Sequence, residues 1–124
     1  MTSVSAHDEI LTLLDGDDLL TLPEVADRLG IPVTRVSDLL EDHKLAATTS
    51  DGRRVVPAAV LGPKNEISKY VAGAITVLID GGYDDEEILT YFFTPDDSLP
   101  GRPIDILHGP RAREVIRRAQ AMAF

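Results

Sequence analysis

The chain has 124 residues, 44% of them hydrophobic, and a formal net charge of −9 at pH 7. This length suits one domain, or a small domain with an extension packed onto it. The sequence contains no cysteine, which excludes a disulfide framework and any thiolate-based metal or redox site.

No targeting signal is recognisable in the sequence. The first nine residues lack both a basic start and an apolar run, so no secretory signal is expected. The most apolar segment, residues 71–79, is too short to span a bilayer, and Lys69 and Asp80 flank it. We therefore expect a cytoplasmic protein with no membrane partner.

An apolar stretch with an acidic interruption comes first along the chain. Residues 10–20 carry six large apolar side chains around Asp15-Gly16-Asp17-Asp18, a pattern that predicts a short helix packed onto the domain that follows. The acidic run resembles the start of a calcium loop, but it lacks the glycine at the sixth position and the closing glutamate. We expect neither a metal nor a cofactor.

Two short helices joined by a tight turn are predicted next. Thr21 and Glu24 have the spacing of a capping box at the start of the first helix, and Gly30 supplies permissive backbone at its end. Pro32 fixes the start of the second helix. Its inward-facing residues, at helical spacing, are Val36, Leu39 and Leu40.

The pattern then changes from helical to extended. Residues 45–49 and 54–56 flank Ser50-Asp51-Gly52-Arg53, and an Asp-Gly pair between two extended runs is a strong hairpin signal. A helix-turn-helix followed by a hairpin is the pattern of a winged helix-turn-helix with a two-stranded β wing. Such a domain lays its second helix in the major groove of DNA.

The polar surface of this unit supplies the candidate contacts to double-stranded DNA. The candidate DNA-binding residues are Thr34, Arg35, Ser37, Lys44, Arg53 and Arg54. Those of the second helix are expected to meet base edges or phosphates, whereas the two hairpin arginines are expected to clamp the backbone. The alternative is a small helical domain that carries a hairpin without binding DNA.

The net charge is the main objection to DNA binding, because phosphate contacts supply most of the non-specific affinity. Much of the acid lies away from the candidate site, in three blocks: Asp15/Asp17/Asp18, residues 84–87 and Asp96/Asp97. Asp38, Glu41 and Asp42 nevertheless remain on or near the second helix. We expect weak non-specific affinity and steep salt sensitivity.

A helical region is predicted after the break Gly62-Pro63-Lys64-Asn65. This break divides the chain into a winged-helix domain at residues 1–62 and a helical domain at residues 63–124. Asp84 and Glu87 have the spacing of a second capping box. The helical segments expected here are residues 67–79, 84–93, 102–108 and 110–123.

Arginines mark the last predicted helix. Those expected to lie largely outside are Arg111, Arg113, Arg117 and Arg118, while Val115, Ile116, Ala119 and Met122 face inward. The arginines form either a solvated face or a second surface for phosphate or an acidic partner. A homodimer through the C-terminal helices is also expected, because segments 67–79 and 91–93 offer more apolar surface than a short region easily buries.

The chain also resembles a known family over roughly residues 17–124. The residues that carry the resemblance are Gly81-Gly82-Tyr83, Phe93-Thr94-Pro95-Asp96, Arg102-Pro103, Arg113-Glu114-Val115 and the run from Arg117 to Ala123. They are similar to a small actinobacterial DNA-binding protein family whose mycobacterial member is a substrate of the Ser/Thr protein kinase L. The resemblance implies a winged helix-turn-helix, DNA binding and a Ser/Thr kinase as a partner.

The resemblance also implies a regulatory phosphothreonine in a flexible N-terminal tail. Here the tail is brief, and its possible acceptors are Thr2, Ser3, Ser5 and Thr12. A second, shorter similarity joins residues 99–107 to the C-terminal domain of some bacterial antitoxins.

Three classes of function follow from these patterns. The first is a DNA-binding transcriptional regulator, and the second is a protein-interaction module, antitoxin-like or a signalling adaptor, that retains the winged fold without specific DNA binding. The third is an enzyme, for which the sequence offers no support. His7, His43 and His108 lie far apart in sequence, and no serine stands in a nucleophile elbow.

Overall fold

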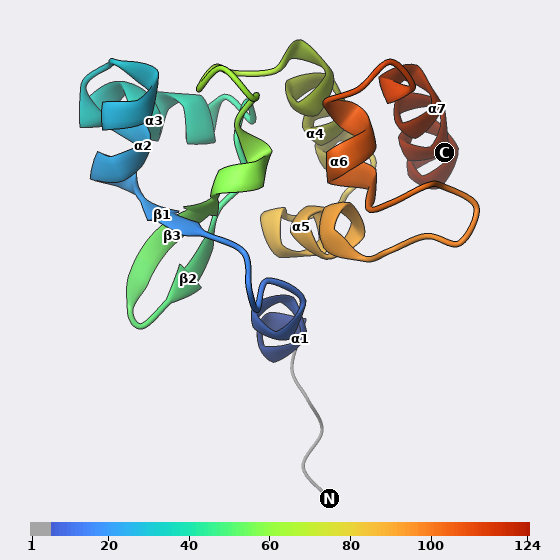
Figure 1. Cartoon of the computed structure of the whole chain (residues 1–124), viewed down its shortest axis with the longest axis horizontal. Coiled ribbons are helices and arrows are strands. Elements are labelled where there is room, and N and C mark those ends of the chain that lie inside the picture. Colours follow the sequence, from blue (N-terminus) through green and yellow to red (C-terminus); the bar gives the residue numbers. More distant parts are fainter. Residues whose placement is uncertain (1–5) are drawn as a thin grey trace, which may run out of the picture.

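The computed structural model describes residues 6–124, which form a mainly helical fold with one small sheet (Figure 1). The elements of the first half, in chain order, are α1 (Ala6–Leu13), β1 (Leu19–Thr21), α2 (Leu22–Leu29), α3 (Val33–Glu41), β2 (Thr48–Ser50), β3 (Arg53–Pro57) and the 3-10 turn η1 (Ala58–Val60). Those of the second half are α4 (Lys69–Asp80), α5 (Asp85–Phe93), α6 (Pro103–Leu107) and α7 (Ala112–Ala123).

The predicted helix-turn-helix is confirmed. The Thr21 hydroxyl accepts a hydrogen bond from the Glu24 N–H at 3.4 Å, and the Glu24 carboxylate accepts one from the Thr21 N–H at 3.0 Å, so the capping box is complete. Gly30 ends α2 with φ 69° in the left-handed region. Val25 and Val36 are fully buried where α2 and α3 pack together.

The sheet has three strands where the sequence predicted two. Its order is β1-β3-β2 and every pair is antiparallel, with Leu20 opposite Val56 and Thr49 opposite Arg54. Strand β1 was missed because three residues are too few to show alternation, and its partner strand lies more than thirty residues away. The central strand β3 therefore bonds on both edges and holds the wing to the helix-turn-helix.

The wing turn is confirmed, although its first strand is shorter than predicted. Asp51 and Gly52 both have positive φ, 52° and 77°, as a tight two-residue hairpin turn requires. Strand β2 begins only at Thr48, and residues 45–47 form a buried connection from α3 instead.

The C-terminal half is a set of packed helices in which α4 lies along α7. The capping box at the start of α5 is confirmed, with Asp84 accepting from the Glu87 N–H at 2.8 Å. Helix α7 begins at Ala112, after a turn at Pro110. The inward orientation predicted for Met122 is wrong, since this side chain is 37% exposed.

Helix α1 contacts a different part of the protein from the one predicted. It packs chiefly against α5 of the C-terminal half rather than onto the helix-turn-helix, and Figure 1 shows the two helices side by side. Ile10 and Leu14 are buried, and the His7 ring nitrogen Nδ1 lies 2.9 Å from the Glu86 carboxylate. Contacts between segments so far apart in sequence leave no local pattern.

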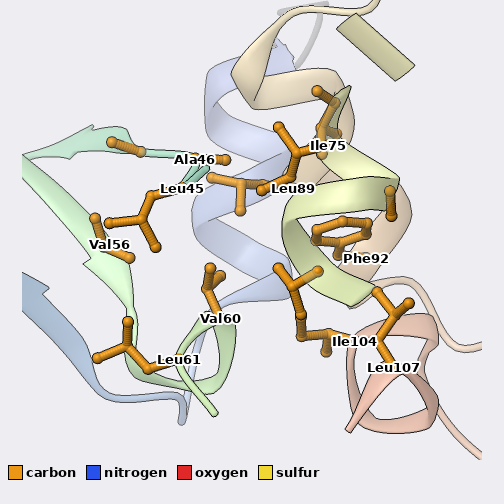
Figure 2. Close-up of a cluster of buried hydrophobic side chains, with 14 of the residues drawn as sticks. Leu45, Ala46, Val56, Val60, Leu61, Ile75, Leu89, Phe92, Ile104 and Leu107 are labelled. Atoms are coloured by element: carbon orange, nitrogen blue, oxygen red, sulfur yellow. The ribbon is translucent and has the colours of Figure 1, made fainter. Parts of the chain in front are cut away.

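A single apolar core runs through both halves. Figure 2 shows Leu45 and Val56 of the winged part facing Leu89 and Phe92 of α5, and all four are buried. The break at residues 62–65 is therefore a surface turn beside a continuous core, and the division of the chain into two domains stays a prediction.

Candidate nucleic-acid interface

Helix α3 presents its N-terminal half to solvent. Thr34 and Arg35 are exposed, and Ser37, one turn further on, is half-buried. Pro32 stands at the N-cap without any side-chain hydrogen bond, and the first turn contains no acidic residue. Among the described residues the backbone N–H groups of Val33 and Thr34 have no acceptor, so the positive end of the helix dipole is left open, an arrangement that favours a negatively charged neighbour.

The acidic residues of α3 gather at its other end. Asp38, Glu41 and Asp42 are all exposed and lie in the last turn or at the C-cap. Carboxylates at this end oppose the helix dipole and repel phosphate. Helix α3 is thus electrostatically asymmetric, and only its N-terminal half is suited to contact a nucleic acid.

The wing brings two cations close to that same end of α3. Arg53 and Arg54 are exposed at the start of β3, and they line a hollow of about 490 Å³ together with Thr21, Leu22, Pro23 and Val33. Figure 1 shows α2, α3 and the hairpin on one side of the molecule, opposite α7. The start of the predicted recognition helix and the wing therefore form one continuous surface. We call it the wing surface, and it consists of the residues that line the hollow together with the exposed Thr34 and Arg35 of α3.

The four cations among the predicted DNA-binding residues have no partner in the part of the chain that the structure describes. Within residues 6–124, the side chains of Arg35, Lys44, Arg53 and Arg54 make no hydrogen bond or ion pair. By contrast, Arg102, Arg117 and Arg118 each pair with a carboxylate, so much of the arginine in the C-terminal half serves the fold. The first group is free to neutralise an external anion.

The six predicted contact residues do not all converge. Arg53 and Arg54 line the hollow, while Thr34 and Arg35 are exposed on the adjoining turn of α3. Lys44 is exposed beyond the C-terminal end of α3, next to the acidic residues, and does not line the hollow. Ser37 offers only part of its surface.

Sequence reasoning overlooked Val33, the first residue of α3. Its side chain is 42% exposed, whereas Val25 and Val36 are completely buried. No sequence signal singles it out, because Val33 precedes Val36 by three residues and helical spacing assigns both to the buried face. Only the position of the wing shows that it lies at the surface of the hollow.

The acidic block at residues 84–87 is occupied by structural hydrogen bonds. Asp84 and Glu87 cap α5, Asp85 accepts from the Ala47 N–H at 3.1 Å, and Glu86 accepts from the Thr48 hydroxyl at 3.2 Å. These carboxylates hold the C-terminal half to the start of β2 and do not lie on the wing surface.

A structural role also accounts for Asp17 in the first acidic block. Arg102 donates to Asp17 at 2.8 Å and to Asp105 at 2.9 Å, and its guanidinium lies 5.0 Å from the centre of the Phe93 ring. The hydrogen bonds to the two aspartates raise the pKa of Arg102, the bond to Asp105 most of all. No group of three or more His, Asp or Glu in the described part of the chain could hold a metal ion.

None of the helices in residues 6–124 has the length and apolar character needed to cross a bilayer.

The three histidines have separate surroundings. His7 contacts Glu86, and the Nε2 atom of His108 lies 2.6 Å from the Ala59 carbonyl oxygen, to which it donates. His43 takes a left-handed conformation, φ 58°, after α3, and among the described residues its buried Nδ1 has no hydrogen-bond partner.

Comparisons with known proteins match both halves of the chain. A family model described as "DNA-binding protein Rv2175c, wHTH domain" matches residues 6–61, which include the helix-turn-helix and the wing. A second, described as "Rv2175c C-terminal domain of unknown function", matches residues 69–123.

A relative and its solved structure carry the same likeness over nearly the whole length. The "DNA-binding protein Rv2175c" of Mycobacterium tuberculosis (strain ATCC 25618 / H37Rv) is 40% identical over 135 residues, covering 98% of this chain and 90% of the relative. The "NMR structure of Rv2175c" superposes with a TM-score of 0.82 at 40% identity, covering 87% of this chain and 82% of that one.

Proposed function

The chain belongs to the family of DNA-binding protein Rv2175c, a family with a winged helix-turn-helix domain, and from this premise we propose that it is a sequence-specific regulator of transcription. The observation that carries the proposal is the unpaired cationic wing beside the open N-terminal end of α3. The two features lie next to each other, and within residues 6–124 no hydrogen bond or ion pair occupies the side chains of Arg35, Arg53 and Arg54. We place its action in the cytoplasm, where such a regulator meets DNA, and assign it no catalytic step.

The candidate residues take different roles on a DNA duplex. Thr34, Arg35 and Ser37 contact base edges or adjacent phosphates in the major groove, because the N-terminal part of a recognition helix enters the groove. Arg53 and Arg54 contact the phosphate backbone on the flank, and Lys44 adds a weaker phosphate contact. No cofactor or metal is needed for any of these contacts.

Selection from a random duplex pool tests this proposal, because the pool offers the protein many different sequences and no target has to be chosen beforehand. The native protein is incubated with the pool at low and at moderate salt, and the bound duplexes are sequenced over several rounds. Enrichment of one motif supports sequence-specific binding. Binding at low salt without enrichment supports an electrostatic, sequence-independent binder, and no binding at low salt rejects the proposal.

The net charge of −9 favours a second candidate, a protein-interaction module that retains the winged fold without specific DNA binding. Under this alternative the unpaired wing arginines would contact an acidic protein instead of phosphate. The same selection separates the two candidates. An interaction module enriches no motif and retains no duplex at moderate salt.

Control by a Ser/Thr kinase is a further part of the proposal, taken from the family resemblance. Thr2, Ser3 and Ser5 lie outside the described residues. Thr12 lies on α1, is exposed, and its hydroxyl donates to the Asp8 carbonyl at 3.0 Å. Mass spectrometry after incubation with a Ser/Thr kinase would identify which acceptor is modified.

We also propose a homodimer through the C-terminal helices, but the apolar surface that supports it differs from the segments 67–79 and 91–93 named in the sequence analysis. The apolar segments thought to need a partner are buried within one chain, with Ile75, Leu78 and Phe92 fully enclosed. Exposed apolar side chains remain at the end of α7, in Met122 and Phe124. A dimer would pair two winged domains on two half-sites, and sedimentation at increasing concentration measures whether it forms.

A further inference from the structure

The hollow between α3 and the wing combines two kinds of surface. Leu22, Pro23 and Val33 give it apolar walls, and Arg53 and Arg54 also line it. Val33, Met122 and Phe124 are the large apolar side chains that are exposed among the described residues, and Val33 alone of these lies on the wing surface. An apolar side chain beside free cations calls for a ligand that offers an apolar group close to negative charge.

Duplex DNA has such a combination in its major groove. The C5-methyl of thymine is the apolar group that a base pair presents there, in a groove bounded by the phosphate backbones of the two strands. The first residue of a recognition helix is placed to meet a base edge, and the acidic C-terminal half of α3 is not. The position, chemistry and charge of Val33 therefore match one particular group on DNA.

We propose that Val33 is a specificity residue that contacts the methyl group of a thymine, next to the bases read by Thr34 and Arg35. This inference rests on the proposed DNA binding and adds to it a preference for thymine at one position of the target. The side chain of Val33 is stiff, because its β-branch limits χ1 in a helix, so its methyl groups are held in place before DNA arrives. The hydroxyl of Thr34 and the guanidinium of Arg35 suit hydrogen bonds to base edges, whereas both γ-carbons of Val33 are apolar.

A methyl-deletion cycle tests the proposal. The duplex enriched from the random pool is resynthesised with each thymine replaced singly by deoxyuracil, which removes one methyl group and keeps every hydrogen bond. Native protein and Val33→Ala are then titrated with each duplex. At one position we expect uracil to weaken native binding about fourfold, the effect of losing one buried methyl, and to leave Val33→Ala unaffected.

Two controls accompany the cycle. Alanine is a good helix former and Val33 is exposed, so Val33→Ala should keep the circular dichroism and melting temperature of the native protein. Met122→Ala truncates another partly exposed apolar side chain, on α7, and should respond to uracil as the native protein does.

The outcomes of these experiments distinguish failure of the role of Val33 from failure of the DNA-binding proposal on which it rests. Equal uracil sensitivity of the native protein and Val33→Ala at every position, or insensitivity of both, overturns the role of Val33 while sequence-specific binding stands. A native protein that enriches no duplex at low salt overturns the DNA-binding proposal, and the role of Val33 with it.

Discussion

The carboxylate of Asp85 accepts a hydrogen bond from the backbone N–H of Ala47 at 3.1 Å, although the two residues belong to different halves of the chain. Ala47 is 6% exposed and immediately precedes β2, the first strand of the wing. The neighbouring carboxylate of Glu86 accepts from the Thr48 hydroxyl at 3.2 Å. The N-terminal turn of α5 thus fixes where the wing leaves the core.

Removing this bond should destabilise the protein through the amide that loses its partner. Asp85→Ala leaves the buried Ala47 N–H without an acceptor, so we expect the free energy of unfolding in urea to fall by about 1–3 kcal/mol. Asp85→Asn keeps an acceptor oxygen and should lose less. The matched control is Asp97→Ala, an exposed carboxylate without a hydrogen bond among the described residues. A native-like urea midpoint for Asp85→Ala would show that water replaces the carboxylate.

A pH dependence follows from the capping box of α2. The backbone hydrogen bond from Thr21 lowers the pKa of Glu24 below its ordinary value of 4.5, with the Thr21 hydroxyl as the next cause. A carboxyl whose pKa is lower in the folded state stabilises the protein above the unfolded pKa. That stabilisation is lost as the pH falls through the lower, folded value.

The variant Glu24→Gln isolates this effect, because glutamine can make the capping bond but does not titrate. We expect the native protein to be the more stable of the two at pH 7, and the difference to shrink towards zero as the pH falls below 4.5. Urea unfolding of both proteins between pH 7 and pH 3 measures it. A difference that stays constant over this range would rule out the charge as the cause.

The wing turn gives a prediction about backbone conformation. Gly52 has φ +77°, and a Cβ placed there would meet nothing within 4 Å, so any cost of substitution is conformational. Gly52→Ala should lose about 1–3 kcal/mol of stability, or shift the turn, because an alanine rarely adopts this φ. DNA binding should weaken while the helical circular dichroism signal is kept. In Gly101→Ala, where φ is not in the left-handed region, neither property should change.

Local signals in the sequence predicted much of this architecture. Contacts between segments far apart in the sequence were not predicted. The Thr21–Glu24 and Asp84–Glu87 boxes, the left-handed Gly30 and the Asp51-Gly52 turn each depend on residues within four positions, so the sequence displays them directly. Strand β1 depends on a partner strand far along the chain, and α1 on a helix of the other half.

In the candidate site, too, local sequence signals identified some residues, and others could be found only from the tertiary structure. Arg53 and Arg54 were predicted because a hairpin tip is exposed wherever the hairpin packs, whereas Val33 follows the same helical period as the buried Val36 and looks like a core residue. Its exposure depends on how the wing and the start of α2 lie against α3. That arrangement is a property of the tertiary structure, which no local pattern records.

The arginines of the wing surface give the last prediction, which distinguishes base reading from phosphate contact. Arg35→Ala should cost about 1–3 kcal/mol on the selected duplex and relax the preference at one or two positions, because a guanidinium on a guanine edge has no equivalent replacement. Arg53→Ala and Arg54→Ala should instead weaken all duplexes alike. Each should reduce the slope of log affinity against log salt by about one unit.

A matched control separates these local effects from the change in net charge. Arg113→Ala also removes one exposed arginine without a partner in the described chain, but from α7, on the far side from the wing. If phosphate contacts at the wing cause the salt dependence, Arg113→Ala keeps the native slope while Arg53→Ala lowers it. If Arg113→Ala and Arg53→Ala lower the slope of log affinity against log salt equally, only the overall charge matters. The wing surface would then have no specific role in DNA binding, and the protein-interaction module would be the better account of the function. The four substituted arginines, Arg35, Arg53, Arg54 and Arg113, are exposed and unpaired within residues 6–124. The free energy of unfolding of each variant should therefore stay within about 0.5 kcal/mol of the native value.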